Sequence, residues 1–306
     1  MNESIQSVLE GLDTIILGKQ REVRLALASL LAGGHLLIED VPGTGKTTLA
    51  LALGRVLGLQ HKRVQFTVDV LPSDITGSSI YRQSEQAFEF HPGPIFSQIL
   101  LADEINRAMP KTQSALLEAM EENAVSQDGI TYPLPSPFFV IATQNPMHHS
   151  GTYPLPESQL DRFLMTLQMG YPSADAELVL LTSGATRQKV LDQPALCTAE
   201  QLLGWQADVR AVKVASAIAD YVLRLVRESR GDASFEMGLS PRGGLALMAA
   251  SRAWALLQGR DFVTPEDVQA VFAAVCQHRL RFRSTEDRAG LLHSINDFLN
   301  QVDVVA

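Results

Sequence analysis

Four residues in one short stretch have the types and spacing needed to bind a polyphosphate. Gly43 and Gly45 flank a threonine, and Lys46 and Thr47 follow directly. Glycines let backbone N–H groups approach phosphate oxygens, the lysine supplies a cation, and the threonine hydroxyl is a ligand for Mg²⁺. An apolar run at 36–38 precedes the stretch, and a helical pattern follows it. This order of strand, loop and helix is typical of a phosphate-binding loop.

The stretch departs from the strict phosphate-loop pattern at Asp40, where that pattern has a glycine. An ordinary glycine-rich turn between a strand and a helix is therefore an alternative. A second motif further along the chain favours the phosphate-binding interpretation.

That second motif is a pair of carboxylates, Asp103 and Glu104, which follow an apolar run at 99–102. Asp103 can hold the Mg²⁺ shell, and Glu104 can orient and polarise a water against the terminal phosphate. A phosphotransferase has less need for such a glutamate, so the pair favours hydrolysis. A solvated acidic turn is the alternative, and the phosphate loop upstream makes it the weaker one.

Taken together, the motifs resemble the MoxR family of AAA+ ATPases. The matching segments are Pro42–Thr47, Asp103–Ala108, Ala142–Pro146 and Leu160–Phe163. The resemblance runs from about Ile15 to Arg242 and is most specific between positions 36 and 163. That family usually enters its phosphate loop through Glu-Asp-Val-Pro, as at 39–42, so Asp40 is a family feature. The resemblance implies ATP and Mg²⁺ as cofactors, with Thr47 and Asp103 at the metal and Glu104 as a catalytic residue.

The resemblance also implies which residues contact the nucleotide. In the phosphate loop they are Pro42, Gly43, Thr44, Gly45, Lys46, Thr47 and Thr48. A short helix break at Ile16, Leu17 and Gly18 lies against the adenine ring in the family. A plain linker with a buried isoleucine is the alternative for this break.

Asn145 and Arg162 match further catalytic positions of the family. Asn145 follows the apolar run 138–142 and corresponds to the first sensor, which holds the attacking water or the terminal phosphate; a turn asparagine is the alternative. Arg162 corresponds to an arginine finger that stabilises charge on the phosphoryl group of the next subunit's nucleotide. The alternative is a surface salt bridge with Asp161, which would contribute little.

Arg242 corresponds to the family's second sensor. Related clades use this arginine across the subunit interface, so its action on its own nucleotide or on a neighbour's stays open. Arg107 is a weaker candidate for the same interface.

Composition restricts the broad class of protein. The chain has 306 residues, 46% hydrophobic and 19% charged, which fits an ordinary soluble protein of two domains. The net charge of −9 argues weakly against broad nucleic-acid binding, because a local basic pore would not show in the sum. No run approaches the roughly 18 apolar residues of a membrane span, and no targeting segment is visible, so we expect a cytoplasmic protein.

Cysteines and histidines give no metal-binding pattern. Cys197 and Cys276 are far apart and outside any paired spacing, which indicates neither zinc nor a disulfide. His148 and His149 are adjacent, so they cannot easily both face one ion, and we expect exposed loop histidines.

The expected fold is α/β, with a P-loop AAA+ core at 1–171 and a smaller all-α lid at 172–306. The core has a parallel sheet flanked by helices, and hairpins interrupt it near 75–94 and 124–137. By resemblance, the phosphate-loop strand lies centrally in the sheet and the first hairpin faces the channel of a ring. Gly170–Ser173 marks the domain boundary.

Helical patterns dominate the second half of the chain, at 177–181, 212–227, 241–257, 265–274 and 287–298. Within the core, the segment 110–122 also reads as a helix. We expect its glutamates, Glu118, Glu121 and Glu122, to face water.

By resemblance, the function is Mg-ATP hydrolysis in a homo-oligomeric ring, a hexamer, that remodels or matures a partner protein. Some relatives assist metal-cofactor insertion, and partner genes often encode von Willebrand factor A domain proteins. A nucleic-acid motor would need basic hairpins, but 78–91 contains only Arg82 and 124–133 contains no Lys or Arg. A module in which nucleotide only switches conformation is the third hypothesis, and Glu104 and Arg162 argue against it.

Overall fold

The computed structural model describes residues 3–41, 43–84, 86–145, 151–183, 190–283 and 288–304. Its centre is a five-stranded sheet in the order β2-β5-β8-β1-β9, with every neighbouring pair parallel. The strands are β1 (His35–Glu39), β2 (His61–Gln65), β5 (Ile99–Asp103), β8 (Phe139–Gln144) and β9 (Phe163–Leu167). The phosphate-loop strand β1 is an interior strand, as expected, but β8 holds the middle position.

Burial explains the composition of these strands. Strands β5 and β9 are buried throughout and β1 and β8 nearly so, which is why they read as continuous apolar runs. Strand β2 forms an edge and is mostly exposed, so its sequence His-Lys-Arg-Val-Gln is polar. The sheet therefore carries charged side chains only along its β2 edge and at the strand ends.

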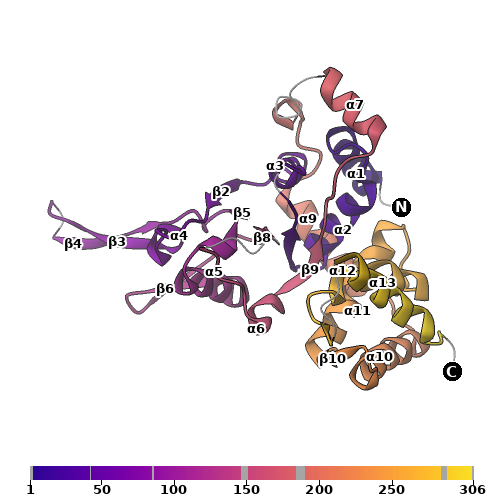
Figure 1. The fold of residues 1–306 in the computed structure, drawn as a ribbon. Coiled ribbons are helices and arrows are strands. Elements are labelled where there is room, and N and C mark those ends of the chain that lie inside the picture. Colours follow the sequence, from indigo (N-terminus) through magenta and orange to yellow (C-terminus); the bar gives the residue numbers. More distant parts are fainter. Residues whose placement is uncertain are drawn as a thin grey trace.

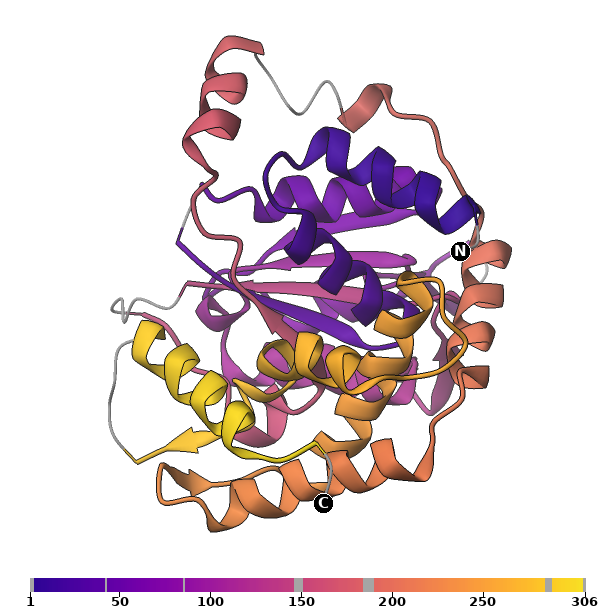
Figure 2. The ribbon, with the colours of Figure 1, turned by 90° about the vertical axis from the view of Figure 1, so that its right-hand side faces the viewer.

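Successive side chains of β1 point to opposite faces, and each face has its own core. Leu36 and Ile38 pack in a core with α1 (Glu3–Ile15), α2 (Gln20–Leu31) and α3 (Lys46–Val56). Leu37 packs in a second core with α4 (Pro72–Thr76) and α5 (Pro110–Glu122). Figure 2 shows the N-terminal helices, in indigo, covering one side of the sheet. This is the three-layer arrangement predicted for the core.

Both stretches expected as hairpins are antiparallel strand pairs. Strands β3 (Gly77–Arg82) and β4 (Ala87–Pro92) form an arm that projects far from the core (Figure 1). Strands β6 (Ala124–Gln127) and β7 (Ile130–Pro133) turn at Asp128-Gly129, where both residues have positive φ as a two-residue hairpin turn requires. Tyr132 stacks on Phe90 with the ring centroids 4.0 Å apart, so the second hairpin supports the base of the first.

The second half of the chain is mainly helical and packs directly on the core. Its helices are α7 (Ala174–Ser183), α9 (Ala199–Ala211), α10 (Ser216–Gly231), α11 (Pro241–Leu257), α12 (Pro265–Cys276) and α13 (Arg288–Gln301). Helix α11 packs on α2, and α12 packs on β9. None of the described helices is long and apolar enough to cross a lipid bilayer.

Two features of this half were not predicted. Strands β10 (Phe235–Met237) and β11 (Arg281–Phe282) form a short antiparallel pair, too short to leave a periodic signal in the sequence. Helix α9 begins with a capping box, in which the Thr198 hydroxyl accepts from the Gln201 N–H at 3.3 Å. That signal is visible in the sequence and was missed. The division of the chain between residues 171 and 172 stays a prediction.

Candidate active site

The loop after β1 has the backbone shape that phosphate binding requires. Gly43 and Gly45 have φ of 88° and 91°, and a Cβ placed on either would meet nothing within 4 Å. Gly45 is the N-cap of α3, so the positive end of that helix points into the loop. The two glycines are therefore needed for conformation and leave open space in front of the backbone. The neighbouring Pro42 lies outside the described residues.

Lys46 lies close enough to both predicted carboxylates to interact with their charges. Burial lowers the pKa of its amine, and the charges of Asp40, Asp103 and Glu104 oppose that shift. The Nζ atom donates to the backbone oxygens of Asp40 at 2.6 Å and Val41 at 3.3 Å. These carbonyl contacts hold the amine at the loop, next to the carboxyl end of β5.

Asp40, the departure from the strict pattern, fastens the loop to the rest of the chain. Its Oδ1 accepts from the Val41 N–H at 2.8 Å, and its Oδ2 accepts from the Gly170 N–H at 2.6 Å. The side chain is almost completely buried, at 9% exposure. A glycine could make neither contact, so the carboxylate supplies a link between the phosphate loop and the segment that leads to α7.

The Asp103 carboxylate is buried and held from two sides. Its Oδ1 accepts from the Thr143 hydroxyl at 2.6 Å, and its Oδ2 accepts from Arg63 Nη2 at 2.6 Å and Nε at 3.2 Å. The same Thr143 hydroxyl accepts from the Glu104 N–H at 2.9 Å. Thr143 and Arg63 were both missed by the sequence analysis. A polar residue at the end of an apolar strand is the signal that identifies Thr143.

Glu104 sits in a left-handed backbone conformation with φ of 56°, which turns it out of the strand direction. Its Oε2 accepts from Gln65 Nε2 at 3.1 Å and from Arg107 Nη1 at 2.9 Å. Gln65 ends β2 and was also missed, although it follows the same strand-end rule as Thr143. Arg107, the weaker interface candidate, contacts the Glu104 of its own chain.

Asn145 directly follows β8, which lies between β5 and β1 in the sheet. It is therefore at the same sheet edge as Glu104 and the phosphate loop. Its backbone oxygen accepts from Asn106 Nδ2 at 3.3 Å. Its role as the first sensor stays a prediction, and His148 and His149 lie outside the described residues.

A cavity of about 200 Å³ brings the helix break next to the phosphate loop. Its lining includes the predicted Ile16, Leu17, Gly43, Thr44, Gly45 and Thr48, together with Met169, Pro172 and Leu180. Gly18 serves the turn: its φ is 71°, and a Cβ there would lie 3.2 Å from the Ala176 Cβ of α7. The cavity is mostly apolar and opens on the loop, which suits a flat base joined to phosphates.

A metal ion bound at this edge would need phosphate oxygens among its ligands. Within the described residues, no three His, Cys, Asp or Glu side chains gather as a metal cluster. The Thr47 hydroxyl, half-buried at the start of α3, and the Asp103 carboxylate are hard oxygen ligands of the kind that Mg²⁺ prefers. Two such ligands fit a Mg²⁺ that arrives with nucleotide phosphates and keeps several waters.

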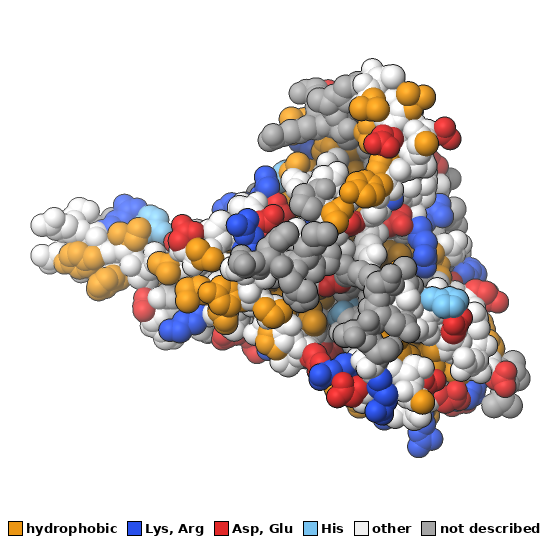
Figure 3. All heavy atoms as spheres, viewed as in Figure 1, with side chains coloured by type: hydrophobic (Ala, Val, Ile, Leu, Met, Phe, Trp, Pro, Cys, Tyr) orange, Lys and Arg blue, Asp and Glu red, His pale blue; other side chains and the backbone are white. Residues whose placement is uncertain are grey.

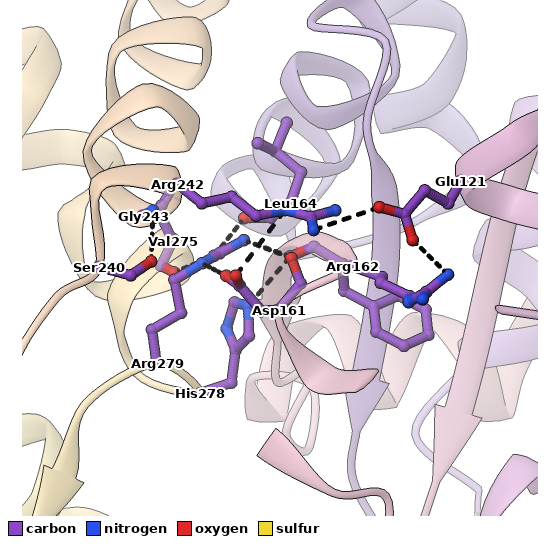
Figure 4. Close-up of polar contacts among 11 residues, drawn as sticks. Glu121, Asp161, Arg162, Leu164, Ser240, Arg242, Gly243, Val275, His278 and Arg279 are labelled. Carbon is purple, nitrogen blue, oxygen red and sulfur yellow. Dashed lines mark hydrogen bonds and ion pairs between the residues drawn. The ribbon is translucent and has the colours of Figure 1, made fainter. Parts of the chain in front are cut away.

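Arg162 and Arg242 gather in a separate cluster around two carboxylates (Figure 4). Arg162 Nη1 lies 2.5 Å from Glu121 Oε2, and Arg242 Nη1 lies 3.5 Å from Glu121 Oε1. The alternative partner considered for Arg162, Asp161, instead binds Arg279 Nε at 2.6 Å and lies 3.7 Å from Arg242 Nε. Glu121 therefore does not simply face water, as the helix pattern had indicated.

This arginine cluster lies at the amino end of the sheet, opposite the phosphate loop. His35 at the start of β1 pairs with Phe163 at the start of β9, which places Arg162 just before the amino end of β9. Residues 33–35, Glu121, Arg162 and Arg242 line one cavity there. The phosphate loop follows the other end of β1, and five residues of strand span roughly 17 Å.

Comparisons with known proteins identify the family. Residues 35–165 match the model described as "ATPase family associated with various cellular activities (AAA)", and residues 227–298 match that of the AAA lid domain. The chaperone MoxR1 of Mycobacterium tuberculosis is 43% identical over 282 residues, covering 87% of this chain and 72% of that protein. This chain belongs to the MoxR family of AAA+ ATPases.

Two further relatives of this MoxR-family chain have similar extent. The protein YeaC of Bacillus subtilis is 48% identical over 272 residues, covering 89% of this chain and 85% of YeaC. The crystal structure of a candidate ATPase from Cytophaga hutchinsonii superposes with a TM-score of 0.87 at 33% identity, covering 98% of this chain and 94% of that one. The AAA+ core and lid are therefore shared along nearly the whole chain.

Proposed function

We propose that this MoxR-family chain hydrolyses Mg-ATP in a ring of identical subunits and uses the reaction to remodel a partner protein. The observation that supports this most is the division of its polar residues between two edges of the sheet: the carboxyl edge, where the parallel strands end, and the amino edge, where they begin. The loop, the cation and both carboxylates are at one edge, and the arginines are at the other. A site divided in this way is completed when one subunit's arginine edge meets the next subunit's loop edge.

Each residue of the loop edge has a distinct role in this proposal. Lys46 leaves its carbonyl partners to bind the outer phosphates, while Ile16 and Leu17 contact the base. Thr47 and Asp103 would hold Mg²⁺, which would neutralise phosphate charge. Glu104, with Gln65 and Arg107 as neighbours, orients the attacking water, and Asn145 stabilises the terminal phosphate from the adjacent strand.

Arg162 and Arg242 act in trans in this proposal. They share Glu121 as a partner at the amino end of the sheet, a strand's length from their own phosphate loop. Both guanidinium groups would therefore address the nucleotide of the neighbouring subunit. A hexamer is the ring size that the family resemblance implies.

A nucleic-acid motor is the weaker alternative. Arg82, the single cation on the arm, forms an ion pair with Glu89 across the hairpin, so it offers little free positive charge. Figure 3 shows apolar side chains gathered along one side of the arm. On the two strands of the arm, Ile80, Tyr81 and Phe88 are 50%, 52% and 74% exposed, and the Tyr81 and Phe88 rings are in contact across the strand pair. Such a surface suits a polypeptide client better than a phosphate backbone.

The client itself is proposed from the resemblance alone. A von Willebrand factor A domain protein is the expected partner class, and assistance in metal-cofactor insertion is the expected outcome in some members. A module in which nucleotide only switches conformation would not need Glu104 or the arginine pair.

Substituting Glu104→Gln tests the proposed reaction. The variant should bind ATP like the parent and hydrolyse it about 10²–10⁴-fold more slowly, because an amide does not polarise water as a carboxylate does. Phosphate release, ATP affinity and assembly mass are the measurements, and Glu122→Gln is the control for an exposed charge. Near-normal turnover would contradict the assigned base. The ATP-bound variant can also capture the client for mass spectrometry.

A further inference from the structure

In the arginine cluster of Figure 4, Glu121 contacts both arginines that the proposed function assigns to the neighbouring subunit's nucleotide. It lies in the last turn of α5, with its side chain 39% exposed. One carboxylate oxygen faces Arg162 and the other faces Arg242. A single carboxylate therefore bridges two guanidinium groups that come from distant parts of the chain.

Helix α5 holds one side of the Arg162 guanidinium group. The Nη1 atom that lies near Glu121 also donates to the Leu117 backbone oxygen at 2.7 Å, one turn earlier in α5. Within the described part of the chain, no partner is assigned to the Nε and Nη2 atoms of Arg162. The group is thus held on one side by α5 and keeps donors for an anion on the other.

Without a shared carboxylate, two neighbouring guanidinium groups would repel each other. Arg242 is also close to Asp161, and Asp161 is in turn bound by Arg279, whose side chain is 4% exposed. Arg279 donates to the backbone oxygens of Leu164 at 3.0 Å and Phe163 at 2.7 Å. This buried arginine anchors Asp161 and the turn that carries Arg162, so one of the two anions beside Arg242 is held from the interior.

We propose that Glu121 is a positioning residue that holds Arg162 and Arg242 side by side for the phosphates of the neighbouring subunit. This inference rests on the proposed function, in which both arginines act in trans. Glu121 itself touches no nucleotide. Its effect is to set the spacing of the two cations before the subunits meet, so that the charge on the transferred phosphoryl group finds both donors in place.

Steady-state measurement of kcat and of KM for ATP with Glu121→Gln tests the proposal. Glu122→Gln, on the same helix, is the matched control. The control makes the same change of charge one residue away, at a side chain with no ion pair among the described residues. We expect kcat of Glu121→Gln to fall about tenfold or more while KM for ATP stays within about threefold, because misplacing a catalytic group affects the chemical step. Glu122→Gln should match the parent.

Mixing experiments separate positioning from damage to the subunit. A Glu121→Gln subunit keeps its phosphate loop, and a Lys46→Ala subunit keeps its arginine pair, so mixed rings should recover part of the activity. Mixing Glu121→Gln with Arg162→Ala should recover nothing, because both defects are at the same edge. If the Gln variant does not fold, Glu121→Ala replaces it, since alanine is well tolerated in a helix.

Several results would overturn the inference. A kcat for Glu121→Gln within about twofold of the parent would do so, and a faster rate would mean that Glu121 restrains the arginines. Recovery with Arg162→Ala, or none with Lys46→Ala in confirmed mixed rings, would also reject it. If Arg162→Ala itself hydrolyses ATP normally, the proposed trans mechanism fails. If Arg162→Ala is inactive and Glu121→Gln hydrolyses ATP normally, the trans mechanism stands and only the positioning role of Glu121 fails.

Discussion

The two edges of the central sheet differ in how their charges are held. At the carboxyl edge, Lys46 rests on backbone carbonyls, and the acids Asp103 and Glu104 have cationic or polar partners. At the amino edge, Arg162 and Arg242 have carboxylate partners. The first edge therefore provides acids and a loop for a nucleotide, and the second provides cations without a loop. The phosphate loop and the arginine pair are thus on opposite edges of the sheet, about one strand's length apart.

The two edges also differ in their relation to the rest of the fold. The carboxyl edge is formed by strand ends and the loop that follows β1. The amino edge combines α5, the turn before β9 and α11, and it is fixed by Arg279 from the region after α12. Two of its arginines, Arg242 and Arg279, come from the second half of the chain, so the amino edge joins that half to the core.

The largest effect on nucleotide binding is expected from removing the cation of the phosphate loop. Lys46→Ala should abolish measurable ATP binding, with a loss of about a hundredfold or more, because the outer phosphates lose their loop cation. Lys62→Ala, which removes an exposed lysine on the edge strand β2, is the control and should bind ATP normally. Calorimetric titration gives both affinities. A parent-like affinity for Lys46→Ala, within about twofold, would remove the basis for the loop assignment.

A smaller effect is expected from weakening the Asp40 hydrogen bonds that link the phosphate loop to residue 170. Asp40→Asn keeps the size of the side chain, but only its amide oxygen can accept, so one of the Val41 and Gly170 N–H groups loses its partner. We expect a loss of about 1 kcal/mol in the free energy of unfolding and weaker ATP binding, because one partly buried N–H is left without an acceptor. Denaturant unfolding measures the first quantity.

Asp232→Asn is the control for Asp40, since Asp232 Oδ1 accepts from the Ser234 N–H at 2.7 Å in an exposed turn. Its effect on unfolding should be smaller, and its effect on ATP binding absent. Equal effects of the two substitutions on both measurements would mean that Asp40 has no special connection to the loop.

The smallest effect is expected when DNA or RNA is added to the protein. The protein should show no useful affinity for DNA or RNA at about 0.15 M salt, because the net charge is negative and Arg82 is paired with Glu89. Fluorescence anisotropy with labelled oligonucleotides measures this. Submicromolar binding would favour the helicase-like alternative and would make the arm a nucleic-acid surface.

The carboxyl edge was largely predictable from the sequence, and the amino edge was not. The loop and the acidic pair are contiguous motifs that follow apolar strands, so their neighbours in space follow from the rule that parallel strands end at one edge. Gln65 and Thr143 obey the same rule and could have been found. Arg63 could not, because a charged residue on an exposed edge strand reads as a solvated side chain.

The arginine cluster escaped prediction because its contacts depend on tertiary packing. Glu121 has the spacing of a solvent-facing helix position, and only the approach of two distant arginines gives it partners. Asp161 precedes Arg162 directly, yet adjacent side chains point apart, and the carboxylate binds Arg279 instead. The family resemblance indicated Arg162 and Arg242 as functional but could not indicate what holds them.

The central claim is that the two edges complete one active site between subunits, and a complementation titration tests it most directly. Lys46→Ala and Arg162→Ala should each be inactive alone, the second by about 10³–10⁵-fold with ATP binding intact. Mixed in varying ratio, they should recover part of the activity, because some interfaces then pair an intact loop with an intact arginine. No recovery at any ratio, with mixed assembly confirmed by mass, would contradict the account.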